Sequence, residues 1–241
     1  ADREKLVSVL ETAELPPQLL ADDAGNSVLV LPHGGRILGL FSASDNTNFL
    51  WTNPRLGSAD TARELFASDQ WHNSGGDRTW LGPELDFFFP DYPDTAVYFQ
   101  PRQLDPGNYK VVADTSHIIL ENNLTIRSAR HAEYMSLRIT KRVQLVRNPL
   151  RYGLEGQELG QLQFAGYRLE STLELLNPQQ TRAHVNIWNL LQLPNGGEMF
   201  VPTYYRSEPT VFFGVIPPGD LRAEERLVRY KMNAPGEQKI S

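Results

Sequence analysis

The chain has 241 residues, of which 40% are hydrophobic and 22% charged, and this supplies enough apolar material for a sizeable core. The composition excludes a disordered, collagenous or coiled-coil protein. Lys and Arg total 23 against 29 Asp and Glu, so the net charge is −6. Because a chain this acidic repels nucleic acids and anionic lipids, we expect neither a nucleic-acid nor a membrane partner.

Cysteine is absent, which excludes disulfides, thiolate catalysis and cysteine-ligated metals. The chain begins Ala-Asp-Arg-Glu-Lys, with neither Met nor an apolar signal region, and no apolar run approaches the roughly 20 residues of a membrane span. Such a start fits a mature chain after signal removal or a piece of a longer protein. It favours a periplasmic or secreted location over a cytoplasmic one, and the oligomeric state stays open.

Residues 1–20 form a predicted N-terminal helical segment, because apolar residues recur at helical spacing and two prolines then end the pattern. The apolar residues are Leu6, Val9 and Leu10, and the prolines are Pro16 and Pro17. Residues 60–67 form the one further predicted helical turn, with Asp60 as its candidate N-cap.

The remainder, residues 21–241, is predicted to be a single β-domain. Residues 134–146 alternate between an apolar and a polar face, and residues 167–176 repeat this pattern. The apolar face of the first run holds Met135, Leu137, Ile139, Val143 and Leu145. Further strands are predicted at 28–31, 37–41, 97–99, 117–121, 124–126, 199–201, 211–216 and 227–230. Long β-runs without helices between them predict antiparallel sheets packed face to face, or a barrel.

The most unusual stretch is residues 71–91, WHNSGGDRTWLGPELDFFFPD. Asp77, Arg78 and Glu84 offer directional hydrogen bonds, and Trp80 offers a flat apolar face. This mixture suits a sugar, whose C–H faces stack on aromatic rings while its hydroxyls need paired donors and acceptors. The alternative is a structural loop in which Arg78 pairs with Glu84 or Asp77.

A second candidate is residues 183–194, AHVNIWNLLQLP, whose odd positions are mostly apolar. The even positions place His184, Asn186, Trp188 and Gln192 together on the opposite face. This face is typical of the floor of a polar, aromatic-lined cleft on a concave sheet. The alternative is an ordinary strand whose Trp188 is covered by a loop.

Arg36 is a third candidate, because it follows Gly34-Gly35 between two predicted strands. It either reaches a ligand or forms a structural salt bridge, and a turn or bulge explains both glycines. The five histidines show no metal-binding spacing, and no dinucleotide, NTP or α/β-hydrolase motif occurs. We therefore expect no metal site and no cofactor.

Three runs, NSVLVLPHGGRILGLF, NFLWTNP and GGDRTWLGPE, resemble the N-terminal half of galactose-mutarotase-like proteins. More closely, they resemble an uncharacterised bacterial branch related to aldose 1-epimerases. The resemblance spans residues 26–230, and GGDRTWLGPE is its most specific piece. It implies an all-β antiparallel supersandwich, with two large sheets, one of them concave, and carbohydrate bound on the concave face.

The same resemblance implies residue roles. Mutarotation needs a carboxylate base for the anomeric hydroxyl and an acid for the ring oxygen. The implied catalytic pair is Glu84 and His184, and the implied substrate-binding residues are Arg36, Asp77, Arg78, Trp80, Trp188 and Gln192. The Asn-Arg and His-x-Tyr/Phe patterns of the epimerases are not clearly present. Their base lies late in a longer chain, so we expect a supersandwich truncated at its C-terminus or a compact variant.

The predicted function is carbohydrate binding, with aldose 1-epimerase-like isomerisation of a sugar ring as the enzymatic hypothesis. Two alternatives remain. One is a non-catalytic binding or accessory module of a glycan-degrading system. The other is a fragment of a glycoside hydrolase or lyase, which would need a carboxylate pair. A histidine facing a carboxylate across the cleft would favour the epimerase, whereas a binding module needs only the aromatic residues.

Overall fold

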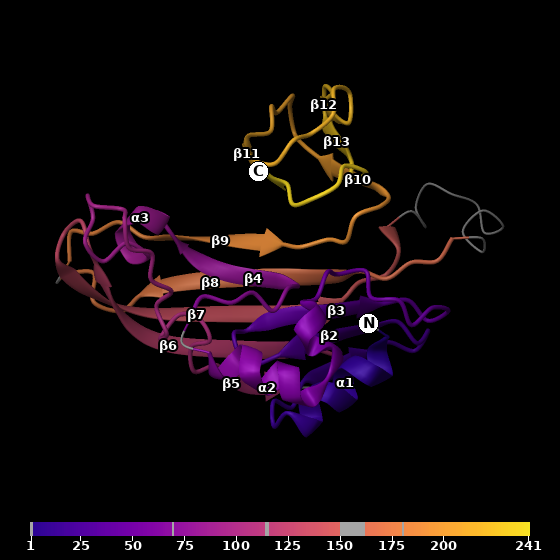
Figure 1. The fold of residues 1–241 in the computed structure, drawn as a ribbon, viewed down its shortest axis with the longest axis horizontal. Coiled ribbons are helices and arrows are strands. Elements are labelled where there is room, and N and C mark those ends of the chain that lie inside the picture. The colour runs from indigo at the N-terminus through magenta and orange to yellow at the C-terminus, as the bar shows by residue number, and fades with distance from the viewer. Residues whose placement is uncertain (1, 69, 114–115, 150–161, 180) are drawn as a thin grey trace. The chain divides into compact units, whose positions relative to one another are not determined.

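The protein forms two compact units, Ala1–Leu193 and Pro194–Ser241, in a computed structural model (Figure 1). The structure describes residues 2–68, 70–113, 116–149, 162–179 and 181–241. Antiparallel sheets make up most of the regular secondary structure, as the sequence predicts. The predicted β-domain thus contains a boundary after Leu193.

The N-terminal helix α1 (Arg3–Thr12) is shorter than the predicted segment of residues 1–20. Asp2 caps it by accepting a hydrogen bond from the backbone N–H of Lys5 at 2.8 Å. Residues 18–21, predicted to be helical, instead form strand β1 (Gln18–Ala21). Strand β2 offers a free edge to these residues once the prolines have ended the helix.

A second helix, α2 (Ala59–Ala67), follows the 3-10 turn η1 (Pro54–Gly57). Its N-cap is Ser58, whose side chain accepts from the backbone N–H of Thr61, so the prediction that Asp60 caps this helix is wrong. Asp60 lies in the first turn, where its charge favours the helix dipole.

The first sheet has the order β1-β2-β3-β4-β9, and every neighbouring pair in it is antiparallel. Its further strands are β2 (Ser27–Leu31), β3 (Arg36–Phe41), β4 (Asp77–Gly82) and β9 (Asn186–Leu191). Helices α1 and α2 cover one face of β2 and β3, where Leu29 and Leu38 pack against Leu6 and Leu65. Strand β4 was not predicted, because its six residues are all buried and show no alternation.

The second sheet has the order β5-β6-β7-β8. Its strands are β5 (Lys110–Ala113), β6 (Ile118–Ser128), β7 (Glu133–Leu145) and β8 (Tyr167–Leu175). The apolar faces of β6 and β7 pack on the first sheet, where Val30 and Ile37 meet Leu120 and Val143. The two predicted strands at 117–121 and 124–126 are the single strand β6.

Residues 97–99 do not form the predicted strand. They lie in the long connection between α3 (Glu84–Phe87) and β5, where Tyr98 stacks on Phe88 with ring centroids 5.7 Å apart. Tyr98 makes this ring contact, whereas Val97 and Phe99 are 55% and 49% exposed.

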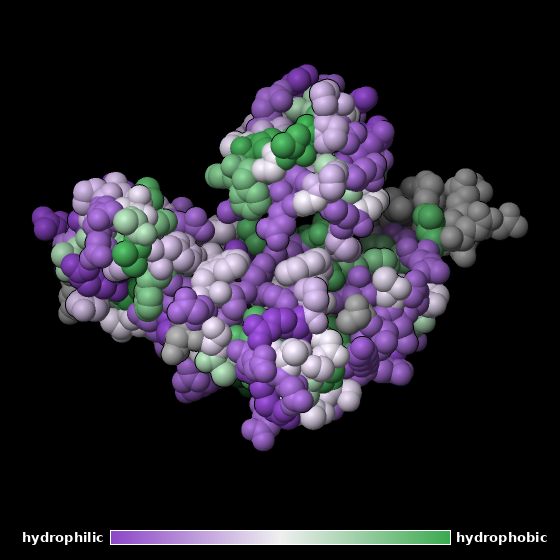
Figure 2. All heavy atoms as spheres, in the orientation of Figure 1, coloured by the Kyte–Doolittle hydropathy of each residue, from purple (hydrophilic) through white to green (hydrophobic). Residues whose placement is uncertain are grey.

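The unit of residues 194–241 contains a three-stranded sheet, β10-β13-β12, and a two-stranded sheet, β11-β14. The strands are β10 (Glu198–Pro202), β11 (Val211–Phe213), β12 (Leu221–Ala223), β13 (Leu227–Lys231) and β14 (Lys239–Ile240). Large hydrophobic side chains are exposed in both units (Figure 2), among them Phe200 and Phe212 here and Val97 and Phe99 beside α3. Within the described ranges, no helix is long and apolar enough to cross a membrane.

Candidate functional site

The candidate residues gather on one face of strands β4 and β9. Arg78 pairs with Leu190 and Trp80 with Trp188, and residues directly opposite each other in an antiparallel pair share a face. Asp77 lies on the other face, toward the second sheet, because side chains alternate along a strand. The structure therefore brings Arg78, Trp80 and Trp188 together and separates Asp77 from them.

Gly76 allows β3 and β4 to approach this closely. Its φ is +72°, which side chains with a Cβ rarely adopt, and a Cβ there would collide with the carbonyl oxygen of Ile37. The guanidinium of Arg36 reaches along the same turn, and its Nη1 donates to the carbonyl oxygen of Gly75 at 3.4 Å. The two glycines are thus needed for the backbone geometry that precedes Asp77.

Arg36 is buried with 1% of its surface exposed and forms a salt bridge with Asp105. The Nη2–Oδ2 distance is 2.6 Å, and the same Oδ2 accepts a hydrogen bond from the indole Nε1 of Trp80 at 2.9 Å. This is the structural salt bridge that the sequence left as the alternative to ligand contact. Asp105 therefore ties together two residues that the sequence placed in the site.

Arg78 lies flat on Trp80, with its guanidinium carbon 3.7 Å from the ring centroid. Its Nη1 donates weakly to Asn73 at 3.5 Å, and its buried Nε has no hydrogen-bond partner in the part of the chain that the structure describes. Burial and the neighbouring charge of Arg36 lower the pKa of Arg78 to about 10. Among the described residues it forms no salt bridge with Glu84 or Asp77, and the carboxylates of Asp105 and Glu84 act on its charge only through space.

Trp80 itself offers no open face to a ligand. It is 3% exposed, because Arg78 covers it, Phe88 lies 4.7 Å away between ring centroids, and Trp188 meets it edge-on at 5.9 Å. Trp188 is partly buried and donates its indole N–H to the carbonyl oxygen of Leu81 at 3.3 Å. Trp80 thus supports Arg78, and Trp188 retains some exposed surface.

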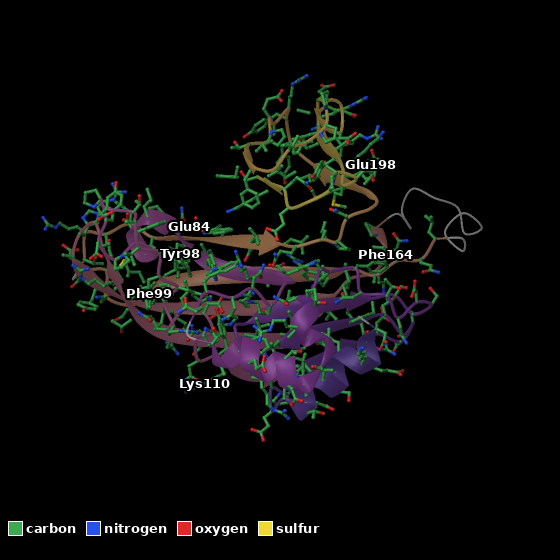
Figure 3. All side chains as sticks on the ribbon, viewed as in Figure 1. Glu84, Tyr98, Phe99, Lys110, Phe164 and Glu198 are labelled. Atoms are coloured by element: carbon green, nitrogen blue, oxygen red, sulfur yellow. The ribbon has the colours of Figure 1, made fainter. Side chains whose placement is uncertain are left out.

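Exposed aromatic residues lie beside this face. Trp71 is 51% exposed and Tyr98 is 41% exposed, and a hydrogen bond from Trp71 acts on the Tyr98 hydroxyl. Burial, and then the charge of Glu84, raise the pKa of Tyr98 to about 12, while Arg78 opposes the rise. Glu84 begins α3, and Figure 3 labels Glu84 and Tyr98 at the same end of this unit. We call Trp71, Arg78, Glu84, Tyr98 and Trp188 the Arg78 site.

Glu84 and His184 both lie just beyond the β4–β9 ladder. The last pair of this ladder is Gly82 with Asn186, so each candidate is two residues past it at the same end. His184 is exposed, and no hydrogen bond or salt bridge joins it to Glu84 among the described residues. Gln192 is at the opposite end, where its backbone N–H donates to Gly76 and its buried Oε1 has no partner within the described ranges.

Asp77 and Lys141 form a second polar group, inside the sandwich. Tyr167 donates to Asp77 Oδ2 at 2.8 Å, and Lys141 Nζ donates to the carbonyl oxygen of Gly35 at 2.6 Å. Burial raises the pKa of Asp77 and lowers that of Lys141 to about 8, although their charges attract each other. Asp77 is therefore a structural partner of the second sheet, on the face away from Arg78.

Sequence reasoning missed Lys141, Asp105 and Tyr98. Lys141 occupies an inward position of the alternating run 134–146 and could have been found as a charge on an otherwise apolar face. Tyr98 was assigned to a strand, and nothing in the sequence connects Asp105 with Arg36, which lies 69 residues away.

Within the described residues, no group of three or more His, Asp or Glu side chains could hold a metal ion. A hollow of about 1000 Å³ lies elsewhere in the first unit, bordered by Asp22, Ser44 and Arg147. None of the residues of the Arg78 site lines it. The hollow and the Arg78 site are thus separate features of this unit.

Comparison with known proteins gives a family and no function. No curated protein and no solved structure matches the chain. A family described as being of unknown function matches residues 4–241, which is nearly the whole chain. The chain therefore belongs to that family, DUF6786.

Proposed function

We propose that this protein binds carbohydrate at the Arg78 site. The observation that carries the proposal is the combination of exposed Trp71 and Tyr98 with a buried Arg78 whose charge has no carboxylate partner among the described residues. A buried cation that no carboxylate contacts directly is costly. A ligand rich in oxygen atoms would relieve that cost.

The chemistry of the site matches a sugar ring. Trp71 and Tyr98 offer flat apolar faces for its C–H groups. The guanidinium of Arg78 donates to hydroxyl oxygens, and the carboxylate of Glu84 accepts from hydroxyl groups. Acidic and basic groups that are held apart suit a ligand carrying both donors and acceptors.

The supporting residues give the site its rigidity. Arg78 rests on Trp80, and the indole of Trp80 is fixed by Asp105. Asp105 is fixed in turn by the buried guanidinium of Arg36. Arg36 and Trp80 thus act on the ligand through Arg78, and a rigid site loses less entropy on binding.

A second candidate function is aldose 1-epimerase-like isomerisation, favoured by the register of β4 and β9. Glu84 and His184 each lie two residues beyond the last pair of the ladder, Gly82 with Asn186. In this reaction Glu84 takes the proton of the anomeric hydroxyl while His184 gives a proton to the ring oxygen. The C1–O bond to the ring oxygen breaks, C1 rotates, and closure on its other face returns both protons.

The test of binding is saturation-transfer NMR with a panel of neutral and acidic mono- and oligosaccharides. We expect saturable binding of at least one sugar, lost in Arg78→Ala and kept in Arg168→Ala, which removes an exposed arginine of β8. Circular dichroism verifies that both variants fold. Binding that survives in a folded Arg78→Ala protein, or no binding across the panel, would refute the proposal.

The test of isomerisation is polarimetry of freshly dissolved α-glucose and α-galactose. An epimerase accelerates mutarotation, and Glu84→Gln and His184→Ala each abolish the acceleration. The matched controls are Glu170→Gln and His131→Ala, which alter exposed residues outside the site. Sugar binding without acceleration would leave a non-catalytic binding module.

A further inference from the structure

Two side chains of the second sheet reach across the interior of the sandwich to the first sheet. Lys141, on β7, is fully buried and donates to the carbonyl oxygen of Gly35 at 2.6 Å. Tyr167, on β8, donates to the carboxylate of Asp77 at 2.8 Å. These are the hydrogen bonds that connect the second sheet to the turn before β3 and to the start of β4.

Each bonded residue immediately precedes an arginine of the opposite face. Gly35 precedes Arg36, and Asp77 precedes Arg78. Asp77 and Arg78 are successive residues of β4, so their side chains point to opposite faces, and a bond to Asp77 fixes the backbone from which Arg78 leaves. Gly35 is the last residue of the turn before β3, and a bond to its carbonyl oxygen fixes the peptide that leads into Arg36. The two hydrogen bonds therefore fix the backbone positions from which the side chains of Arg36 and Arg78 extend.

A lysine at position 141 is energetically unfavourable as a core side chain. The other inward side chains of β7, Met135, Leu137, Ile139 and Val143, are apolar and fully buried. Replacing a buried charge by an apolar side chain of similar size is often neutral or stabilising, so packing does not explain a lysine here. Its charge faces groups from three other parts of the fold, namely Asp77 on β4, Arg36 on β3 and Asp105 before β5.

We propose that Lys141 and Tyr167 are positioning residues for the Arg78 site: they fix the backbone on either side of the β3–β4 pairing so that Arg36 holds Asp105 and Arg78 lies on Trp80. The effect on a sugar rests on the proposed function, whereas the effect on the arginines does not. Lys141 and Tyr167 act through Gly35 and Asp77 and do not touch the ligand.

The experiment uses the indole N–H resonance of Trp80, which donates to Asp105 beneath Arg78. We expect Lys141→Met and Tyr167→Phe to shift this resonance in the folded protein. The matched controls, Lys110→Met and Tyr134→Phe, change exposed residues of β5 and β7 and leave it in place (Figure 3 labels Lys110). Tyr167→Phe removes a single oxygen atom and keeps the test available if Lys141→Met does not fold.

A pH titration adds a signature that a purely structural role would not give. In the wild type the Trp80 resonance moves as Lys141 loses its proton near pH 8, and this step is absent in Lys141→Met. The other charged or titratable groups around this interior are Asp77, Tyr167, Arg36, Asp105 and Tyr109. Burial raises the pKa of Asp77, so Asp77→Asn is titrated as well: a step near pH 8 that persists in Asp77→Asn and is absent in Lys141→Met reports on Lys141.

A Trp80 resonance that is unchanged in both folded variants and shows no step near pH 8 would overturn the proposal. For a sugar that binds the wild type, Tyr167→Phe should weaken binding by up to about tenfold, because a less firmly held Arg78 side chain loses more entropy when the ligand immobilises it. If no sugar binds the wild type, the proposed function fails while the Trp80 resonance still decides the role of Lys141 and Tyr167.

Discussion

Arg36 and Asp105 are 69 residues apart in the chain, yet their side chains form a buried salt bridge with a nitrogen–oxygen distance of 2.6 Å. Both side chains are nearly fully buried, with exposed fractions of 2% and 5%. The bridge joins the start of β3 to the connection before β5 and places a charged acceptor beneath Trp80. The geometry of the Arg78 site depends on this pair.

Asp105→Asn should therefore destabilise the protein strongly, because it leaves the charge of Arg36 buried without compensation. The expected loss in the free energy of unfolding is about 3–5 kcal/mol. Chemical denaturation measures it. Glu64→Gln, which breaks the exposed pair of Arg55 and Glu64, should cost about 1 kcal/mol or less. Equal losses in the two variants would contradict the account.

Lys141 should make stability depend on pH. It loses its proton near pH 8 in the folded state and near 10.5 when unfolded, so between these values the unfolded chain binds more protons. The contribution of Lys141 to the free energy of unfolding therefore rises with pH across this window, by about 3 kcal/mol. Denaturation at about pH 7 and about pH 10 measures the rise. The part of this rise that Lys141 causes should disappear in Lys141→Met. If the free energy of unfolding depends on pH identically in the wild type and in Lys141→Met, the prediction is wrong.

Gly76→Ala should be poorly tolerated. The new methyl group would meet the carbonyl oxygen of Ile37, and the backbone has a φ of +72° that favours glycine. We expect a loss of about 1–3 kcal/mol, seen as a lower melting temperature. Gly57→Ala is the control, because a Cβ at Gly57 meets nothing within 4 Å and its φ is not positive. A melting temperature unchanged in Gly76→Ala would show that β3 and β4 are less closely fixed than the structure indicates.

Trp71→Ala should separate binding from stability. Because half of the Trp71 surface is already exposed, its removal should change the free energy of unfolding by about 1 kcal/mol or less. Loss of an aromatic stacking surface should nevertheless weaken sugar binding at least tenfold, which calorimetric titration would show. Tyr134→Ala removes a comparably exposed aromatic residue of β7 and should leave the affinity unchanged. A Trp71→Ala protein with wild-type affinity would remove Trp71 from the site.

The parts of the fold with a local periodic pattern were predictable. Strand β7 alternates along its whole length, because one face is buried and the other is solvated. Helix α1 was predicted for the same reason, with Leu6 and Leu10 buried as expected. In both cases the sequence pattern follows directly from a boundary between core and solvent.

Strand β4 shows why the rest could not be predicted. All six of its residues are buried, so no solvated face imposes alternation, and Asp77 and Arg78 read as surface residues. Their burial is possible only because Tyr167 and Trp80 partner them, and the Tyr167 contact joins residues 90 positions apart. The local periodicity of a sequence does not reveal contacts between residues so far apart in the chain.

The segments that contribute to the candidate site were predictable from the sequence, but the spatial arrangement of their side chains was not. Arg78, Glu84 and Trp188 were selected from their own segments, and the register of β4 with β9 brings two of these segments together. The roles differ from the expectation, since Trp80 is covered and Asp77 faces inward. Tyr98 enters the site through its stacking on Phe88, which depends on the packing of a long connection.

The most direct test of the central claim is an NMR titration that follows the Nε–H resonance of Arg78 while a sugar that binds in the saturation-transfer panel is added. The account predicts a saturable shift of this resonance, together with the indole resonances of Trp71 and Trp188, at one common affinity. Binding that shifts other resonances and leaves that of Arg78 unmoved would contradict the assignment of the ligand to this site.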